Sequence, residues 1–149
     1  MTASARVCVV LDTNVAASSL MNPHSPPHKI TDAALSGALN AVINNNILSE
    51  YCHVLFRQKF RRYYSAELAA AFLRELFDVS VQCQPAALPA GLHMPDADDI
   101  VFYTTALASR AAGNTTYLVT GNLKHFPKDD FVVSPRALLD MLEQGNTQQ

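Results

Sequence analysis

The sequence has few of the features that would place it in a specialised class of protein. Its three cysteines, Cys8, Cys52 and Cys83, are widely spaced, so they predict neither a disulfide framework nor a zinc site. No apolar run approaches the roughly 18 residues of a membrane span, and the first residues lack the longer apolar core of a signal peptide. We therefore expect no membrane anchor and a cytoplasmic location.

An excess of positive charge is also missing. The 11 Lys and Arg residues and the 13 Asp and Glu residues give a formal net charge of −2, which argues against a basic protein that coats nucleic acid. A nuclease is not excluded, because a carboxylate cluster lowers the net charge while the cations that it binds restore positive charge beside phosphate. With 149 residues, 49% of them hydrophobic and 16% charged, the chain is predicted to be a single globular domain.

Short apolar runs alternate with amphipathic segments along the chain. Strands are predicted at about 7–11, 39–43, 79–83, 117–120 and 131–133. After a proline-containing loop, helices are predicted at about 29–35, from the cap cluster at 44–46 to 58, from the cap Ser65 onward, at 98–111, and from Ser134-Pro135 to just before Gly145.

The alternation of strands and helices predicts an α/β fold with a central parallel sheet that is flanked by helices on both faces. The expected core comprises about residues 7–143, and a disordered tail is expected at 144–149. Three helices have a predicted apolar face. The faces consist of Leu48, Tyr51 and Leu55 in the first, of Leu68, Phe72 and Leu76 in the second, and of Ile100, Tyr103, Leu107 and Ala111 in the third.

Two polar residues follow strands of the predicted sheet, at the edge where such sheets bind ligands. Asp12 comes directly after the 7–11 strand, and Asn122 comes shortly after the strand at 117–120. Asp12 could equally form an Asx turn that caps the backbone at the strand exit. Its position at the end of the first strand favours a role in a cleft.

Further acidic residues lie near the starts of two helices. Glu50 could simply interact with a helix dipole, and Asp96 could be an N-cap with Asp99 in the first turn. One cap does not require Asp96, Asp98 and Asp99 together, and crowded carboxylates repel one another unless they share a divalent cation. Mg²⁺ and Mn²⁺ prefer oxygen ligands and can activate water toward a phosphodiester. The acids therefore favour metal-assisted hydrolysis.

Four short motifs, in this order, resemble those of PIN-domain nucleases. They are Val9-Val10-Leu11-Asp12-Thr13-Asn14, Ile47-Leu48-Ser49-Glu50-Tyr51, the segment 95–103 with Asp96 and Asp99, and Leu118-Val119-Thr120-Gly121-Asn122. The resemblance runs from Val7 to about Pro127 and implies a PIN-like fold. It implies that Asp12, Glu50 and Asp99 are catalytic metal ligands and that Asp96 is an accessory ligand. It also implies that Asn14 and Thr120 hydrogen-bond the ligands or the substrate.

The fourth motif departs from the family pattern, because many members have an aspartate where this chain has Asn122. An amide oxygen can still hold a metal or its water but brings no charge, so a second ion would bind more weakly. Otherwise the resemblance implies a Mg²⁺- or Mn²⁺-dependent endoribonuclease similar to the VapC-like toxins of bacterial toxin–antitoxin pairs. The implied partners are an RNA substrate and an antitoxin protein, and family members often form homodimers.

Asn122 also motivates the main alternative, a catalytically weak or inactive PIN-like module that binds RNA or a protein. A haloacid-dehalogenase-type phosphatase is disfavoured, because Asn14 occupies the place of its second aspartate. The sequence contains no G-x-G-x-x-G motif, so a dinucleotide-binding domain is not predicted.

The segment 57–64 interleaves basic and aromatic residues. Its cations Arg57, Lys59, Arg61 and Arg62 could bind phosphates while its rings stack on unpaired bases. Equally, the segment could be an exposed helix end, with arginines near the negative pole of the dipole and tyrosines packed on the core. Lys124, after the Asn122 turn, could contact phosphate near the metal, whereas the neighbouring histidine is interpreted as an ordinary loop residue.

Overall fold

The structure is a computed structural model that describes residues 6–147, and it describes side chains as far as residue 145. Within this range five strands form a parallel sheet in the order β3-β2-β1-β4-β5. They are β1 (Cys8–Leu11), β2 (Asn40–Ile43), β3 (Val81–Gln82), β4 (Thr116–Val119) and β5 (Val132–Val133). Each strand lies in or overlaps a segment predicted from the sequence, and β3 is shorter than predicted because the preceding helix continues to Val79.

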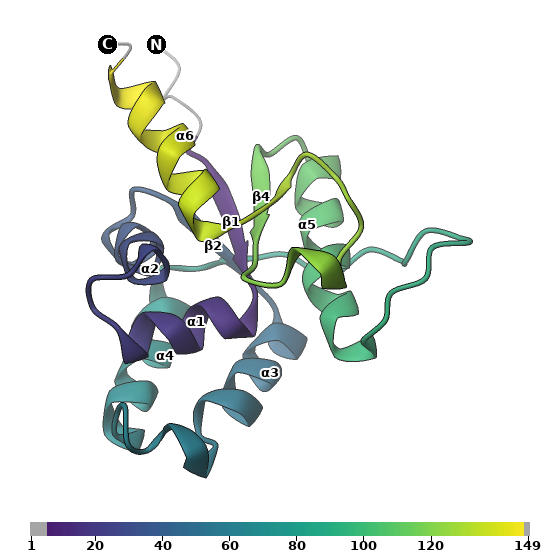
Figure 1. Ribbon diagram of the computed structural model, residues 1–149. Helices are drawn as coiled ribbons and strands as arrows, with labels where there is room; N and C mark the ends of the chain where they lie inside the picture. The colour runs from purple at the N-terminus through teal and green to yellow at the C-terminus, as the bar shows by residue number, and fades with distance from the viewer. Residues whose placement is uncertain (1–5, 148–149) are drawn as a thin grey trace.

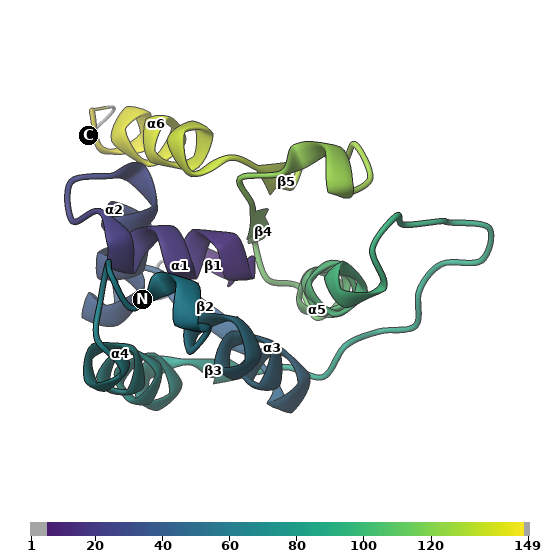
Figure 2. The same ribbon diagram turned by 60° about the horizontal axis from the view of Figure 1, so that its bottom comes forward.

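The helices cover both faces of the sheet, as predicted. They are α1 (Thr13–Met21), α2 (Pro26–Ser36), α3 (Asn45–Leu55), α4 (Ala66–Val79), α5 (Ile100–Ala111) and α6 (Pro135–Thr147). Figure 1 shows how they surround the strands, and Figure 2 shows α2 and α6 on one side with α3 and α4 on the other. None of the helices within residues 6–147 is both long and apolar enough to cross a membrane.

The central strand β1 is buried on both faces, so its alternate residues enter two separate cores. One core lies between the sheet and α3, α4 and α5, and it includes Cys8, Val10, Tyr51, Leu76 and Phe102. The other core lies on the side of α2 and α6, and it includes Val9, Leu11, Ile30 and Leu138. This double burial explains why the sequence of the strand is a continuous apolar run.

Helix α1 was not predicted, because the sequence analysis assigned the residues after Asp12 to a loop. The helix consists of small and polar residues, and it buries Thr13 and Ser19 together with Val15 and alanines, so its sequence has no clear apolar stripe. It nevertheless forms where the Asp12 carboxylate accepts a hydrogen bond from the first helical N–H group.

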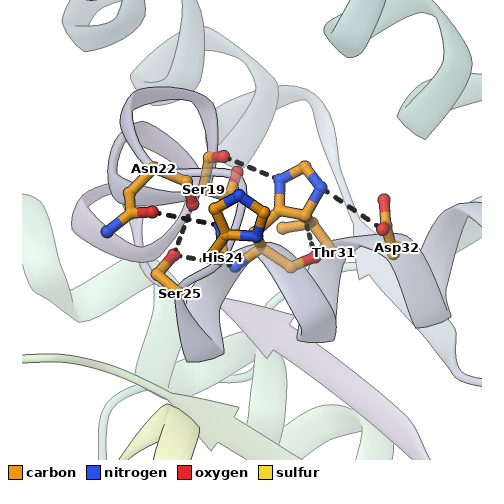
Figure 3. Close-up of polar contacts among 7 residues, drawn as sticks. Ser19, Asn22, His24, Ser25, Thr31 and Asp32 are labelled. Carbon is orange, nitrogen blue, oxygen red and sulfur yellow. Dashed lines mark hydrogen bonds and ion pairs between the residues drawn. The ribbon is translucent and has the colours of Figure 1, made fainter.

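The turn after α1 is held by hydrogen bonds between α1 and α2 (Figure 3). Nδ1 of His28 lies 2.9 Å from the carbonyl oxygen of Ser19 and, because a carbonyl only accepts, donates to it. Nε2 of the same ring lies 3.3 Å from Asp32, and the Ser25 hydroxyl donates to the carbonyl of Asn22. Ser25 also caps α2, which therefore begins at Pro26, before the predicted start.

The predicted core faces of α4 and α5 were partly wrong. Leu68 is exposed, and α4 instead buries Ala69, Phe72, Leu73 and Leu76. Helix α5 is rotated from the predicted stripe, with Ala111 exposed and with Phe102, Tyr103, Thr104, Thr105, Ala106 and Ser109 buried. The buried hydroxyl groups of α5 have hydrogen-bond partners inside the protein. Because part of the buried face of α5 is polar, the spacing of apolar residues does not identify that face.

Two predicted helix ends were also wrong. Helix α3 ends at Leu55, and Gln58 belongs to a separate 3₁₀ turn (Gln58–Phe60). Helix α6 continues through Gly145 to Thr147 rather than ending before that glycine. The last residues of the predicted tail, 148–149, lie outside the described range.

The buried side chain of Asn44 joins three parts of the chain. Its Oδ1 atom accepts a hydrogen bond from the N–H group of Ile47 at 2.9 Å, which caps α3. Its Nδ2 atom donates to the carbonyl of Cys83 at 3.0 Å and to the hydroxyl of Thr105 in α5 at 2.7 Å. This side chain therefore fixes α3 and α5 relative to the end of β2.

Asn44→Ala is expected to lower the free energy of unfolding by about 3 kcal/mol, because it removes a helix cap worth ~1 kcal/mol and two hydrogen bonds worth ~1 kcal/mol each. Ser65→Ala, which removes only the exposed cap of α4, is the matched control and is expected to cost about 1 kcal/mol. Urea unfolding followed by circular dichroism measures both. Equal losses would contradict the joining role of Asn44.

Candidate functional site

A pocket of about 340 Å³ lies at the carboxyl ends of β1 and β4. It brings together the acidic residues that the sequence analysis selected, although they come from three distant segments. The acids that line it are Asp12, Glu50, Asp96, Asp98 and Asp99. The three segments meet because β1 and β4 are adjacent in the sheet while α3 and α5 pack against its end.

Asp12 is the most buried of these acids, with 5% of its surface exposed. One carboxylate oxygen accepts a hydrogen bond from the N–H group of Thr13 at 2.8 Å, and the other accepts from the hydroxyl of Thr120 at 2.7 Å. Burial raises the pKa of Asp12, and these two hydrogen bonds limit the rise. Thr120 thus donates to one of the carboxylates that the sequence analysis expects to be a metal ligand.

Asp99 enters the pocket from the 3₁₀ turn Ala97–Asp99 that precedes α5. Its Oδ2 atom is buried and accepts no hydrogen bond, although Nδ1 of His125 lies 3.3 Å away. Burial, followed by the charges of Asp12 and Asp96, raises the pKa of Asp99 to about 6. Asp96 is the N-cap of the turn, which is the structural role that the sequence analysis considered for it. Asp96 also lines the pocket.

Glu50 lies on α3 at the border of the pocket and is partly buried. Burial and then the charge of Asp98 raise its pKa. The next residue, Tyr51, is buried, and its hydroxyl donates to the carbonyl of Leu11 at 2.6 Å. This hydrogen bond ties α3 to the last residue of β1, so that Glu50 and Asp12 face the same pocket.

The two amide residues of the motifs line the same pocket. Oδ1 of Asn14 accepts a hydrogen bond from the N–H group of Gly121 at 3.2 Å, which joins the start of α1 to the turn after β4. Asn122 is exposed, and its own N–H group donates to the hydroxyl of Thr120 at 2.9 Å. Of these two side chains, Asn14 is thus used to hold the backbone of the turn.

The basic residues are divided among several places. Arg57 and Lys59 line the acidic pocket, whereas Arg61 and Arg62 line a neighbouring groove. Lys124 lines a different pocket, formed by the loop 123–132, and is not brought to the acids.

His125 is the residue whose position the sequence analysis missed. It was interpreted as an ordinary loop residue, but it lines the acidic pocket beside Asp99. Its closeness to Asn122 in the sequence was the only signal, and that signal did not show which way the ring points.

The pocket fits a divalent ion that keeps several of its waters better than an ion that protein side chains surround on all sides. In the described part of the chain, no group of three or more His, Cys, Asp or Glu side chains has the arrangement to hold a metal ion. Mg²⁺, however, is usually held by one or two carboxylates and keeps several waters. The Oδ2 atom of Asp99, which has the His125 ring nearby but accepts no hydrogen bond, and the remaining lone pairs of Asp12 offer such ligands.

Asp99→Asn is expected to stabilise the metal-free protein at about pH 7.5 and to lose this effect toward about pH 4. The folded-state pKa is raised from 3.8 to about 6, so native Asp99 loses stability as pH rises through this window and bears the full penalty above it. The midpoint of urea unfolding at each pH measures the difference. Asp130→Asn, an exposed acid outside the pocket, is the control, and a stabilisation of Asp99→Asn that did not depend on pH would contradict the charge argument.

Comparison with known families identifies the family to which the chain belongs. A family model described as "PIN domain" matches residues 8–124, a range that contains every motif residue from Asp12 to Asn122. No curated protein and no solved structure gave a significant match. The resemblance predicted from the four motifs is confirmed at the level of the family. Because the match spans well over half of the chain, this protein belongs to the PIN domain family, whose members are generally nucleases and typically use divalent metal ions.

Proposed function

We propose that the chain is a Mg²⁺- or Mn²⁺-dependent endoribonuclease that hydrolyses phosphodiester bonds with water as the nucleophile. The observation that carries the proposal is the meeting of Asp12, Glu50 and Asp99 in one pocket, where one oxygen of Asp99 is buried without a hydrogen bond. Membership of a nuclease family supports the same chemistry.

In this proposal Asp12, Glu50 and Asp99 hold the divalent ion or its waters, with Asp96 as an accessory acid beside it. When bound, the ion supplies Lewis acidity and positive charge at the scissile phosphate. Thr120 orients Asp12 through its hydrogen bond to Oδ2. Glu50, with its raised pKa at the pocket border, is suited to accept a proton from the attacking water.

The substrate must overcome the negative charge of five carboxylates. Arg57 and Lys59 are the lysine and arginine residues that line the acidic pocket among the described residues, and we propose that they contact the phosphates of RNA. Arg62 would extend this contact into the neighbouring groove. Arg61 and Lys124 support the proposal less, because Arg61 is hydrogen-bonded to backbone carbonyls and Lys124 lies in another pocket.

The similarity of the motifs to those of VapC-like toxins supports a role as the toxin of a toxin–antitoxin pair, with a cytoplasmic location, an antitoxin as protein partner and a homodimer as the assembly. Expression of the wild-type chain, but not of Asp12→Asn, should then arrest bacterial growth. Co-expressed antitoxin should relieve the arrest.

A catalytically weak or inactive module that binds RNA or protein is the second candidate. Two observations favour it: Asn122 brings no charge to the pocket, and no three-residue metal cluster is found among the described residues. Binding of RNA without Mn²⁺-dependent cleavage would support this candidate over the nuclease.

Asp12→Asn, Glu50→Gln and Asp99→Asn are each expected to lower Mn²⁺-dependent cleavage of RNA at least about 100-fold, since loss of a residue that merely orients a ligand already costs roughly 10–100-fold. A gel assay with labelled RNA measures the rates, and circular dichroism checks that the variants fold. Asp130→Asn is the matched control. Wild-type rates in folded Asp12→Asn or Asp99→Asn would disprove the site assignment.

Asn122→Asp is expected to tighten Mn²⁺ binding about tenfold, because a sixth carboxylate in the pocket adds a Coulomb attraction on the order of 1 kcal/mol in a solvated site. Isothermal titration of the metal-free protein with Mn²⁺ measures the affinity. Asn114→Asp places the same charge on an exposed turn and serves as the control. An equal gain in both variants would mean that Asn122 takes no part in the site.

A further inference from the structure

A groove lies beside the acidic pocket and is continuous with it. The groove has a volume of about 710 Å³ and is formed by residues 58–63 together with Met21. It shares Met21, Lys59 and Phe60 with the lining of the acidic pocket. We call it the basic groove, because it contains Lys59, Arg61 and Arg62.

The structure divides the basic and aromatic residues of this segment into two groups. Arg61 and Tyr64 belong to the framework, because the Arg61 guanidinium donates to the carbonyls of Leu55 and Tyr64 and the buried Tyr64 hydroxyl also donates to Leu55. These hydrogen bonds satisfy carbonyl groups at the end of α3 and after it. Arg61 and Tyr64 therefore have the structural role that the sequence analysis gave as the alternative to RNA binding.

The other group faces solvent. Tyr63 is 48% exposed, and the guanidinium of Arg62 lies 4.9 Å from the centre of its ring and donates to its hydroxyl. The ammonium of Lys59 lies 5.2 Å from the centre of the Phe60 ring. The Phe60 ring is partly buried, whereas Arg62 lies beside an exposed ring, which is the combination that binds the backbone and the bases of a single strand.

The charges around the acidic pocket leave one favourable approach for a polyanion. Two other hollows adjoin it, one lined by Asn14, Gly121 and Asn122 and the other by Glu50 and Asp98. Among the described residues that line these two hollows there is no lysine or arginine. Of these three neighbouring hollows, the basic groove is therefore the one whose described lining residues attract a phosphate chain.

We infer that an unpaired stretch of the RNA strand next to the cleaved bond lies in the basic groove, with its phosphates at Lys59 and Arg62 of the groove and at Arg57 of the adjoining acidic pocket, and with a base stacked on Tyr63. The inference rests on the proposed function and adds to it the substrate class and the direction from which the strand enters. The strand must be unpaired, because a base inside a duplex keeps both faces stacked and cannot meet the ring of Tyr63.

The test is binding of a labelled, unstructured RNA oligonucleotide to the full chain in EDTA, followed by fluorescence anisotropy at several salt concentrations. Tyr63→Ala is expected to weaken binding about tenfold, and Tyr63→Phe, which keeps the ring, is expected to bind like the wild type. Arg57→Ala, Lys59→Ala and Arg62→Ala should each reduce the slope of log K against log salt by about 0.7. Lys29→Ala, an exposed cation on α2, should leave the slope unchanged.

A duplex of the same sequence is expected to bind more weakly and to be insensitive to Tyr63→Ala. The inference is overturned if the wild type binds no RNA, if Tyr63→Ala binds as well as Tyr63→Phe, if Lys29→Ala changes the slope as much as Lys59→Ala does, or if the duplex binds as tightly as the single strand. Failure of the proposed function looks different: groove-dependent RNA binding without cleavage would refute the nuclease but support the groove.

Discussion

The burial of the Asp12 carboxylate at the end of the central strand is the constraint on which the rest of the site depends. Because β1 is covered on both faces, little water reaches the side chain that follows it, and 5% of Asp12 remains exposed. The N–H group of Thr13 and the hydroxyl of Thr120 replace part of the lost solvation. The nearby charge of Asp99 then adds repulsion, so the protein keeps a locally unfavourable group of charges that an ion can relieve.

Much of the fold could be predicted from the sequence, because strands that are buried on both faces need continuous apolar runs and because capping residues mark the starts of helices. Asn44 and Ser65 cap helices in the structure as predicted. Helix α1 could not be predicted, since its buried face is made of small and polar side chains. The rotation of α5 was hidden for the same reason: Thr105 is buried only because Asn44, which lies far away in the sequence, donates a hydrogen bond to it.

The acids of the site were predictable because each belongs to a short motif. Asp12 follows a strand end and Asp96 and Asp99 precede α5, whereas Glu50 lies in the middle of α3 rather than near its start, as the sequence analysis expected. The orientation of His125 and the separate roles of Arg61 and Arg62 were not predictable. Adjacent arginines have the same chemistry in a sequence, and only the position of the Leu55 carbonyl shows that one of them belongs to the framework. Spacing can thus place a residue near a site, but burial and hydrogen-bond partners decide its role.

The hydrogen bond between Thr120 and Asp12 spans 108 positions of the chain. During translation, a ribosome that has released β1 but not β4 would expose a nascent chain in which Asp12 is still hydrated and its partner hydroxyl has not yet been made. The acidic pocket can close only after nearly the whole domain has emerged. Such long-range pairing slows folding, and here it also means that an incomplete translation product lacks a finished centre for acting on nucleic acid.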